Sequence, residues 1–268
     1  MVALCLMPFN WLIETIKWRV LVTQIQKISF LDSVKSILAG VLLSLPTPNR
    51  IGELGGRLLY IEKGKRTSVF YINSVCSLTQ VLITTLLGLW SFYMLNELLN
   101  KWVVFNNEYL LFTVFIISIV LLFVYFYSNS LHRLFNLFSK QEFEVKLKIS
   151  YLNKFYLMGF SFLRYLIFIM QFYLLMIVFE PQITFLDSSL AIALTFFITA
   201  AIPTGGLSDL PVRTSIVIYV LDLMGYNGSA GLSASIILWI INLLIPAIFS
   251  LIILRKIDWV AKFKWRKE

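Results

Sequence analysis

Apolar residues run along the chain in long stretches that short polar and basic segments separate. Five stretches are long enough to cross the roughly 30 Å of hydrocarbon in a bilayer: residues 2–22, 67–95, 109–128, 155–179 and 229–254. Two further apolar regions are shorter and run into proline and glycine breaks: Ser33–Leu45, and Ser188–Ile202 followed by Val212–Met224. Because short apolar segments are typical of re-entrant helices, the pattern predicts an all-α polytopic membrane bundle with five full spans and two re-entrant helical hairpins.

The composition supports the same interpretation. Of the 268 residues, 59% are hydrophobic and only 14% are charged, whereas about 25% of the residues in a soluble domain are charged. A soluble fold of this size has no interior large enough to hide that much apolar surface. This excludes a soluble enzyme, a nucleic-acid module and a disordered tail, so we expect no nucleic-acid partner.

The basic residues predict the orientation in the membrane. Of the 23 lysines and arginines, 20 fall in four segments: 17–35, 49–66, 129–154 and 255–268. The loops 96–108 and 180–187 contain a single basic residue, Lys101. Because cytoplasmic loops are enriched in lysine and arginine, we expect a multi-pass protein of the cell (inner) membrane with a cytoplasmic C-terminus. Residues 130–148 mix apolar and basic side chains, which predicts a helix on the cytoplasmic membrane surface.

The two breaks resemble each other. Residues 46–57 and 203–213 both read Pro-Thr, a short turn, and then acid-Leu-x-x-Arg. The two hairpins would enter from opposite sides, so we expect one membrane domain, 1–268, of two inverted halves, 1–100 and 101–268, with the first span of the first half missing. We expect both hairpin tips to lie buried within the membrane span region and close to each other. The alternative is that two proline-rich turns share a few residues by chance.

Four motifs carry a resemblance to a known family: Trp11-x-x-Glu14-x-x-Lys17-Trp18, Pro48-x-Arg50-x-Gly52-Glu53-x-x-x-Arg57, Pro203-x-Gly205-Gly206, and Trp239-x-x-Asn242-x-x-x-Pro246. They resemble the lysylphosphatidylglycerol synthase transmembrane region, a flippase-like membrane domain, over nearly the whole chain. The second break departs from the family pattern, since Ser208 stands where a glycine is usual and Pro211 where a glutamate is usual. The resemblance implies that the membrane domain moves lipids between leaflets. The resemblance also implies that, in full-length synthases, a separate soluble domain carries out the aminoacyl transfer. These residues do not contain such a domain.

The predicted site centres on Arg57 and Arg213, because an ionised arginine inside a membrane is costly and is usually functional or paired. Arginine also binds phosphate through two parallel hydrogen bonds. The predicted substrate-binding residues are Arg50, Glu53, Arg57, Thr204, Gly205, Gly206, Asp209 and Arg213, and the structural breaks are Pro46, Pro48, Gly52 and Pro203. The alternative is that Glu53 with Arg57, and Asp209 with Arg213, one helical turn apart, only offset burial.

Glycines and isolated charges add further expectations. Gly52, Gly55 and Gly56 are expected to allow tight turns and close approach of the backbone. Arg164 is expected to snorkel to the cytoplasmic interface. The segment Glu14–Trp18, with Glu14 and Lys17 one turn apart, is expected to anchor the first span at the interface.

The leading hypothesis is a translocator of a phospholipid or polyprenyl-linked anionic lipid, with no catalytic residue, metal or cofactor. The sequence has a single histidine, His132, and no nucleotide-binding glycine loop. One alternative is a membrane enzyme that acts on lipid-linked sugars or head groups, with Glu53 and Asp209 as acid and base. Another is an accessory subunit. The missing span predicts an apolar flank beside residues 2–22 that a homo-oligomer, a partner membrane protein or upstream sequence covers.

Overall fold

The computed structural model describes residues 1–47, 51–99, 107–127, 149–202 and 206–255. These residues form helices and contain no strand, which confirms the all-α prediction. The helices are α1 (Val2–Val22), α2 (Phe30–Ser44), α3 (Ile51–Leu58), α4 (Arg66–Met94), α5 (Asn96–Leu99), α6 (Asn107–Phe126), α8 (Tyr151–Phe179), α9 (Phe185–Ala201), α10 (Asp209–Leu223), α11 (Gly228–Trp239) and α12 (Ile245–Leu254). Shorter turns are η2 (Lys63–Lys65), η3 (Gly206–Ser208) and the π-helical η4 (Ile240–Leu244). The surface helix predicted at 130–148 lies outside the described residues.

Within the described residues, three helical segments are long and apolar enough to cross a membrane: Lys63–Met94, Tyr151–Phe179 and Gly228–Leu254. They coincide with three of the predicted spans. Phe112–Phe126 and Phe185–Ala201 are shorter apolar helices. The count of five full spans stays a prediction.

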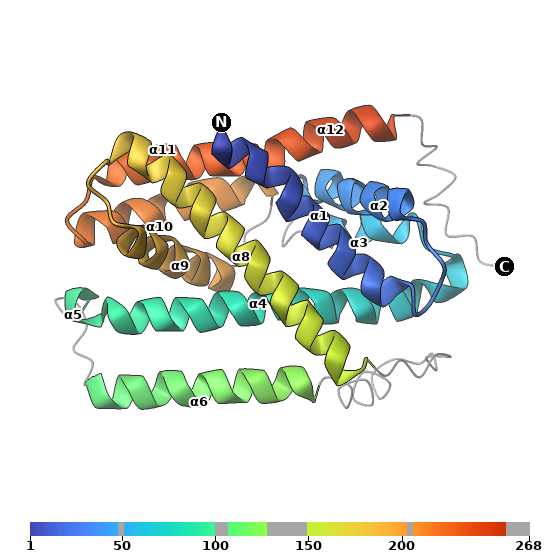
Figure 1. Cartoon of the computed structure of the whole chain (residues 1–268), viewed down its shortest axis with the longest axis horizontal. Helices are drawn as coiled ribbons and strands as arrows, with labels where there is room; N and C mark the ends of the chain where they lie inside the picture. The colour runs from blue at the N-terminus through green and yellow to red at the C-terminus, as the bar shows by residue number, and fades with distance from the viewer. Residues whose placement is uncertain (48–50, 100–106, 128–148, 203–205, 256–268) are drawn as a thin grey trace.

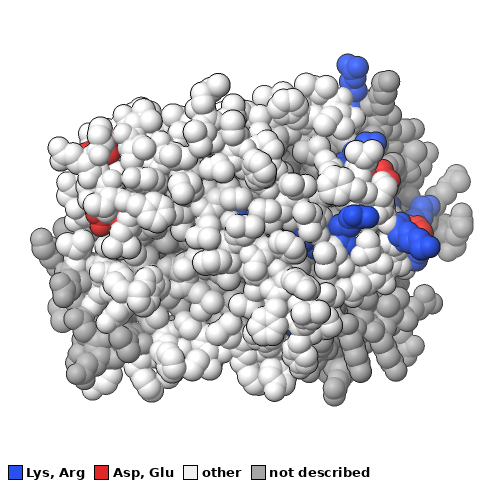
Figure 2. Space-filling model, in the orientation of Figure 1, with Lys and Arg blue, Asp and Glu red and all other residues white. Residues whose placement is uncertain are grey.

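The outer face of the bundle is apolar, and Figure 2 shows charged side chains only sparsely over its middle. On α6, Phe112, Phe115 and Phe123 are each about 60% exposed. On α1, Phe9 and Leu12 are also exposed, and what covers this flank stays a prediction. Such large apolar surfaces are unfavourable in water and are compatible with lipid. The chain is therefore an integral membrane protein.

Two helical hairpins enter the bundle from opposite ends (Figure 1). α2 and α3 pack against each other at one end, and α9 and α10 pack against each other at the other end. α4 runs the length of the bundle and contacts both α3 and α9, while α8 crosses it and packs against α1. The long helices thus form a frame that holds the two hairpins facing each other.

Both hairpins pack against one buried apolar cluster, which consists of Val41, Trp239, Leu243 and Ala247. Leu45 follows the end of α2 and Leu210 lies in the first turn of α10, and both pack against this cluster. Both hairpins therefore reach one cluster inside the bundle, whereas the residues that flank their turns are exposed: Pro46, Ile51, Ile202 and Leu207. That the tips lie buried and close together stays a prediction, because residues 48–50 and 203–205 lie outside the described residues.

Helices α2 and α9 begin with nearly the same sequence and the same cap. Ile28–Ser33 reads ISFLDS and Ile183–Ser188 reads ITFLDS. The side-chain oxygen of Ser29 accepts a hydrogen bond from the backbone N–H of Asp32 at 3.0 Å, and Thr184 and Asp187 repeat this bond at 3.1 Å. Each cap satisfies a free donor at the start of a helix. This second pair of matching segments, which a comparison of the breaks alone misses, favours a true repeat over a chance likeness.

Glycines let the two helices of the first hairpin touch backbone to backbone. A Cβ added at Gly56 would lie 2.3 Å from the backbone of Ala39, and one at Gly52 would lie 1.8 Å from the carbonyl oxygen of Leu43. A Cβ at Gly55 would meet nothing within 4 Å. The prediction of close approach is correct for Gly52 and Gly56 and wrong for Gly55, which has open space at its Cβ position.

Neighbouring glycine substitutions should therefore differ in effect. Gly56→Ala forces α2 and α3 apart and should lower the free energy of unfolding by about 1–3 kcal/mol. Gly55→Ala is the matched control and should be neutral or stabilise by up to about 1 kcal/mol, because alanine favours helix. Thermal unfolding of the two purified variants in detergent measures both. Equal losses of stability would contradict the close packing of this hairpin.

Candidate functional site

The centre of the site is the carboxylate of Glu14 on α1. Its Oε1 accepts a hydrogen bond from Nη2 of Arg57 on α3 at 2.7 Å. Its Oε2 accepts a hydrogen bond from Nη1 of Arg164 on α8 and lies 3.5 Å from Nζ of Lys17. One carboxylate therefore holds three helices together and balances charge from three cations.

This arrangement corrects two predictions. Glu14 and Lys17 form the predicted i,i+3 pair, but Glu14, Lys17 and Trp18 are at most 5% exposed, so they do not anchor the span at the interface. Arg164 does not snorkel, because its side chain is only 12% exposed and its Nε donates to Oδ1 of Asn10 at 2.8 Å. A carboxylate on a neighbouring helix offers Arg164 a stronger partner than water at the interface.

The first hairpin contributes Arg57, which is 2% exposed. It forms the predicted pair with Glu53, one turn earlier on α3. Its Nη1 also donates to Oδ1 of Asn73 on α4 at 3.1 Å, and its guanidinium lies 5.1 Å from the ring centroid of Trp18. Arg57 is thus shared between two carboxylates, an amide and an indole face.

The second hairpin contributes Arg213, built on the same plan. Arg213 pairs with Asp209, one turn earlier on α10, as predicted. Its guanidinium lies 5.1 Å from the ring centroid of Phe196 on α9. The side chains of Arg213 and Asp209 are 18% and 19% exposed. Each hairpin therefore carries an acid–arginine pair beside an aromatic ring, which α1 supplies in the first case and α9 in the second, and the second cluster is the more open.

A chain of amide side chains continues from Arg164 across the bundle. Nδ2 of Asn10 donates to Oδ1 of Asn242 at 3.2 Å, and Nδ2 of Asn242 donates to Oε1 of Gln171 at 3.0 Å. Nε2 of Gln171 in turn donates to the carbonyl oxygen of Ala3 at 2.8 Å. Polar residues inside a membrane protein are expensive unless they satisfy one another, and this chain does so over three helices.

Asn242 reaches this chain from the π-helical turn η4, which the prediction of one regular span at 229–254 did not include. Pro246 has no N–H, so it cannot bond the carbonyl of Asn242 four residues earlier. The wider turn accommodates that missing bond, and π-helical turns frequently occur at functional sites.

Some members of this network had no place in the sequence prediction. The sequence prediction did not include Asn10, Asn73 or Ser161. In the structure, Nζ of Lys17 donates a hydrogen bond to Oγ of Ser161 at 3.1 Å. The available signal was a polar side chain inside an apolar span. Of the predicted residues, Pro46 lies exposed in the turn after α2 and Gly206 begins η3, whereas five lie outside the described residues: Pro48, Arg50, Pro203, Thr204 and Gly205.

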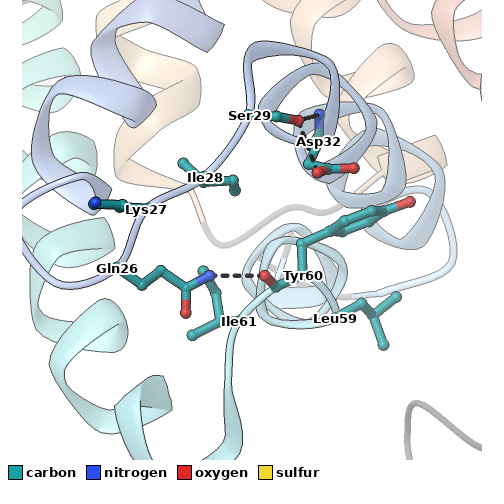
Figure 3. Close-up of a pocket in the computed structure, with 8 residues that line it drawn as sticks. All are labelled: Gln26, Lys27, Ile28, Ser29, Asp32, Leu59, Tyr60 and Ile61. Carbon is teal, nitrogen blue, oxygen red and sulfur yellow. Dashed lines mark hydrogen bonds between the residues drawn. The ribbon is translucent and has the colours of Figure 1, made fainter.

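An open pocket of about 440 Å³ lies at the base of the first hairpin (Figure 3), lined by Gln26, Lys27, Ile28, Ser29, Asp32, Leu59, Tyr60 and Ile61. Gln26 crosses it and donates to the carbonyl oxygen of Tyr60 at 3.0 Å. Burial, with the Asp32 carboxylate nearby, raises the pKa of Tyr60 to about 12, so its phenol stays protonated. At the base of the second hairpin, Tyr226 donates to the equivalent aspartate, Asp187, at 2.6 Å.

Comparison with known proteins finds a family whose model matches most of the chain. The family model described as the lysylphosphatidylglycerol synthase TM region matches residues 1–250. No curated protein matches the chain, and no solved structure matches it. Within the described residues, no group of three or more His, Cys, Asp or Glu side chains could hold a metal ion.

The two glutamates of the network should contribute unequally to stability. Glu14→Gln leaves Arg57, Arg164 and Lys17 without their shared carboxylate, so it should cost about 3–5 kcal/mol, as for breaking a buried ion pair. Glu53→Gln is the matched control: its side chain is 28% exposed and Arg57 keeps Glu14, so a loss of about 1 kcal/mol or less is expected. Thermal unfolding in detergent compares them. A smaller loss for Glu14→Gln than for Glu53→Gln would contradict the central role of Glu14.

Proposed function

Because the chain belongs to the lysylphosphatidylglycerol synthase TM region family, we propose that it is a flippase. It moves a phospholipid or polyprenyl-linked lipid with an anionic head group between the leaflets of the cell membrane. The hairpins are re-entrant helices of an inverted repeat, and the head group crosses between their tips.

The observation that carries this proposal is that both hairpins reach the same buried cluster. α2–α3 and α9–α10 enter from opposite ends, and Leu45 and Leu210 pack against the same buried cluster. In many transporters with inverted repeats, the substrate binds where broken helices of the two halves meet. A site at this position can be reached from either side by moving one hairpin at a time.

The charges beside the tips suit an anionic head group. Arg57 and Arg213, one on each hairpin, provide planar donors that match phosphate oxygens. Arg57 and Glu14 are nearly fully buried, so the structure corresponds to a closed state that a lipid enters only when the hairpins part. The existing carboxylate partners keep the arginines ionised between transport events.

The charge at the two ends of the bundle supports the orientation. Figure 2 shows lysine and arginine side chains gathered at one end, with a few acidic side chains among them, and acidic side chains at the other end. The basic end includes the loop with Lys27 and the turn η2, and the acidic end includes Glu180 and Asp187. Because α12 ends at the basic end (Figure 1), the positive-inside rule supports the proposal of a cytoplasmic C-terminus.

The ion pairs of Glu53 and Asp209 favour a role in transport over a role in catalysis. Glu53 and Asp209 are each paired with an arginine one turn away. A general acid or base must instead reach the proton that it transfers. These pairs support the proposal that the partner is a membrane lipid that leaves the site unchanged.

Reconstitution tests the function. The purified protein is placed in vesicles that contain a trace of fluorescent anionic phospholipid. It should move this lipid from the inner to the outer leaflet, where an external quencher can reach the probe. Arg57→Gln and Arg213→Gln should each slow this roughly 10- to 100-fold, because each removes charge-assisted hydrogen bonds to the head group. Membrane insertion should be unchanged, since it depends on apolar length and loop charge.

Arg19→Gln is the matched control, because Arg19 is exposed at the end of α1 and lies outside both clusters. It should transport at the wild-type rate. Wild-type rates in both site variants would refute the site. Conversion of the lipid to a new product, detected by mass spectrometry, would favour the enzyme alternative.

A further inference from the structure

Two arginines from different helices bind the two oxygens of one carboxylate. Oε1 of Glu14 accepts a hydrogen bond from Nη2 of Arg57 on the first hairpin, and Oε2 accepts one from Nη1 of Arg164 on α8. Arginine binds carboxylates and phosphates through the same planar donors, because both ligands present equivalent acceptor oxygens that share a negative charge. The pair Arg57 and Arg164, which we call the arginine clamp, is therefore suited to a phosphate as well as to Glu14.

The arginine clamp is lined by further hydrogen-bond donors that Glu14 does not reach. Nε of Arg57 and Nε1 of Trp11 and Trp18 are buried and have no acceptor among the described residues. The guanidinium carbon of Arg57 lies 5.1 Å from the ring centroid of Trp18, and that of Arg164 lies 5.9 Å from the ring centroid of Trp11. Because a buried donor without an acceptor is costly, the clamp favours a ligand that brings additional acceptor oxygens.

The spacing along α1 places these groups together. Trp11 precedes Glu14 by three residues and Trp18 follows it by four, so all three lie on one face of the helix. The side chain of Arg164 is 12% exposed and Trp11 is half-buried, whereas Glu14 and Trp18 are buried. A head group therefore approaches the clamp from the side of Arg164 and Trp11.

The bond between Arg57 and Glu14 joins a part that moves in the proposed transport to a part that stays. Arg57 belongs to the first hairpin, whereas Glu14 and Arg164 belong to the long helices α1 and α8. When the hairpin parts from these helices the bond breaks, and a buried charge that loses its partner is strongly unfavourable. An incoming anion replaces the partner that Arg57 loses. Glu14 keeps Lys17 beside it, at 3.5 Å on the same helix.

We propose that the phosphate of the transported lipid displaces Glu14 from the arginine clamp. This inference rests on the proposed function and adds Arg164, Trp11 and Trp18 to its head-group site. In the structure, Glu14 occupies the place of the ligand. During transport the phosphate oxygens accept hydrogen bonds from the two arginines and the two indoles, and Glu14 returns when the lipid leaves. The carboxylate thus competes with the lipid, which keeps the affinity low enough for release.

Glu14→Gln separates competition from support. Short-chain phosphatidylglycerol is titrated into the purified full chain in neutral detergent, and calorimetry measures its affinity. Glu14→Gln should bind this lipid about tenfold or more tightly than the wild type, because a neutral amide holds the arginines less strongly than a carboxylate. Weaker binding would show that Glu14 only positions the arginines, and it would overturn the displacement. Glu62→Gln, which is exposed just before η2, is the matched control and should bind as the wild type does.

Variants that keep Glu14 test the other members of the site and do not depend on the folding of Glu14→Gln. Trp11→Phe and Trp18→Phe retain an aromatic ring and remove an N–H, so each should weaken lipid binding about threefold or more. Arg164→Gln should weaken it about tenfold or more. Trp90→Phe, at an exposed position of α4, is the matched control and should keep the wild-type affinity. Wild-type affinity in all three site variants would overturn the clamp.

The same titrations, together with the vesicle assay, separate this inference from the proposed function. If the wild type binds and transports the lipid but Glu14→Gln binds it less tightly, the displacement fails and the flippase stands. If Glu14→Gln binds more tightly but the wild type moves no lipid in vesicles, the flippase fails and the clamp remains a lipid-binding site. Inorganic phosphate is titrated in parallel, and an affinity equal to that of the lipid would overturn the assignment of the clamp to a lipid head group.

Discussion

The structure depends on one buried carboxylate, that of Glu14. It accepts hydrogen bonds from Arg57 and Arg164 and lies against Lys17, so it joins the first hairpin to α1 and α8. No apolar contact could fix the relative position of these helices as strictly, because lipid tails compete with apolar side chains for the same surfaces. Within the bilayer a charged network is satisfied in very few arrangements. The network therefore selects how the hairpin sits against the frame.

The two hairpins share the same helix cap and the same acid–arginine spacing, but their arginines differ in exposure. Each begins with a Ser/Thr–Asp cap and carries an arginine one turn after an acid and against an aromatic ring. Arg57 is nearly inaccessible and has a second carboxylate, whereas Arg213 is partly exposed. The base of the first hairpin holds an open pocket, and the base of the second is joined by the Tyr226–Asp187 hydrogen bond. This difference is compatible with the proposed transport, in which two related units would expose the site in turn.

The frame gives the proposed re-entrant hairpins a protein surface to pack against. Backbone that is not helical must be buried in protein or line a cavity to survive at membrane depth. The helix ends beside the turns approach this condition, since Leu45 and Leu210 pack against the cluster of Val41, Trp239, Leu243 and Ala247. The backbone contacts of Gly52 and Gly56 keep the first hairpin thin enough to fit beside α4 and α12.

The sequence by itself determined the features that depend on neighbours along the chain. Apolar length predicted the long helices, proline and glycine breaks predicted the hairpins, and the four-residue spacing predicted the pairs of Arg57 and Arg213 with their acids. Tertiary structure alone decided which distant groups meet. Arg57 and Arg164 are far from Glu14 in sequence, and helical periodicity contains no information on how α1 crosses α3 and α8. The local rules therefore assigned Glu14 and Arg164 to the interface, since a charge in an apolar span is satisfied by water when its neighbours are unknown. In the folded bundle these charges satisfy one another instead, because the crossing helices bring them within hydrogen-bond distance.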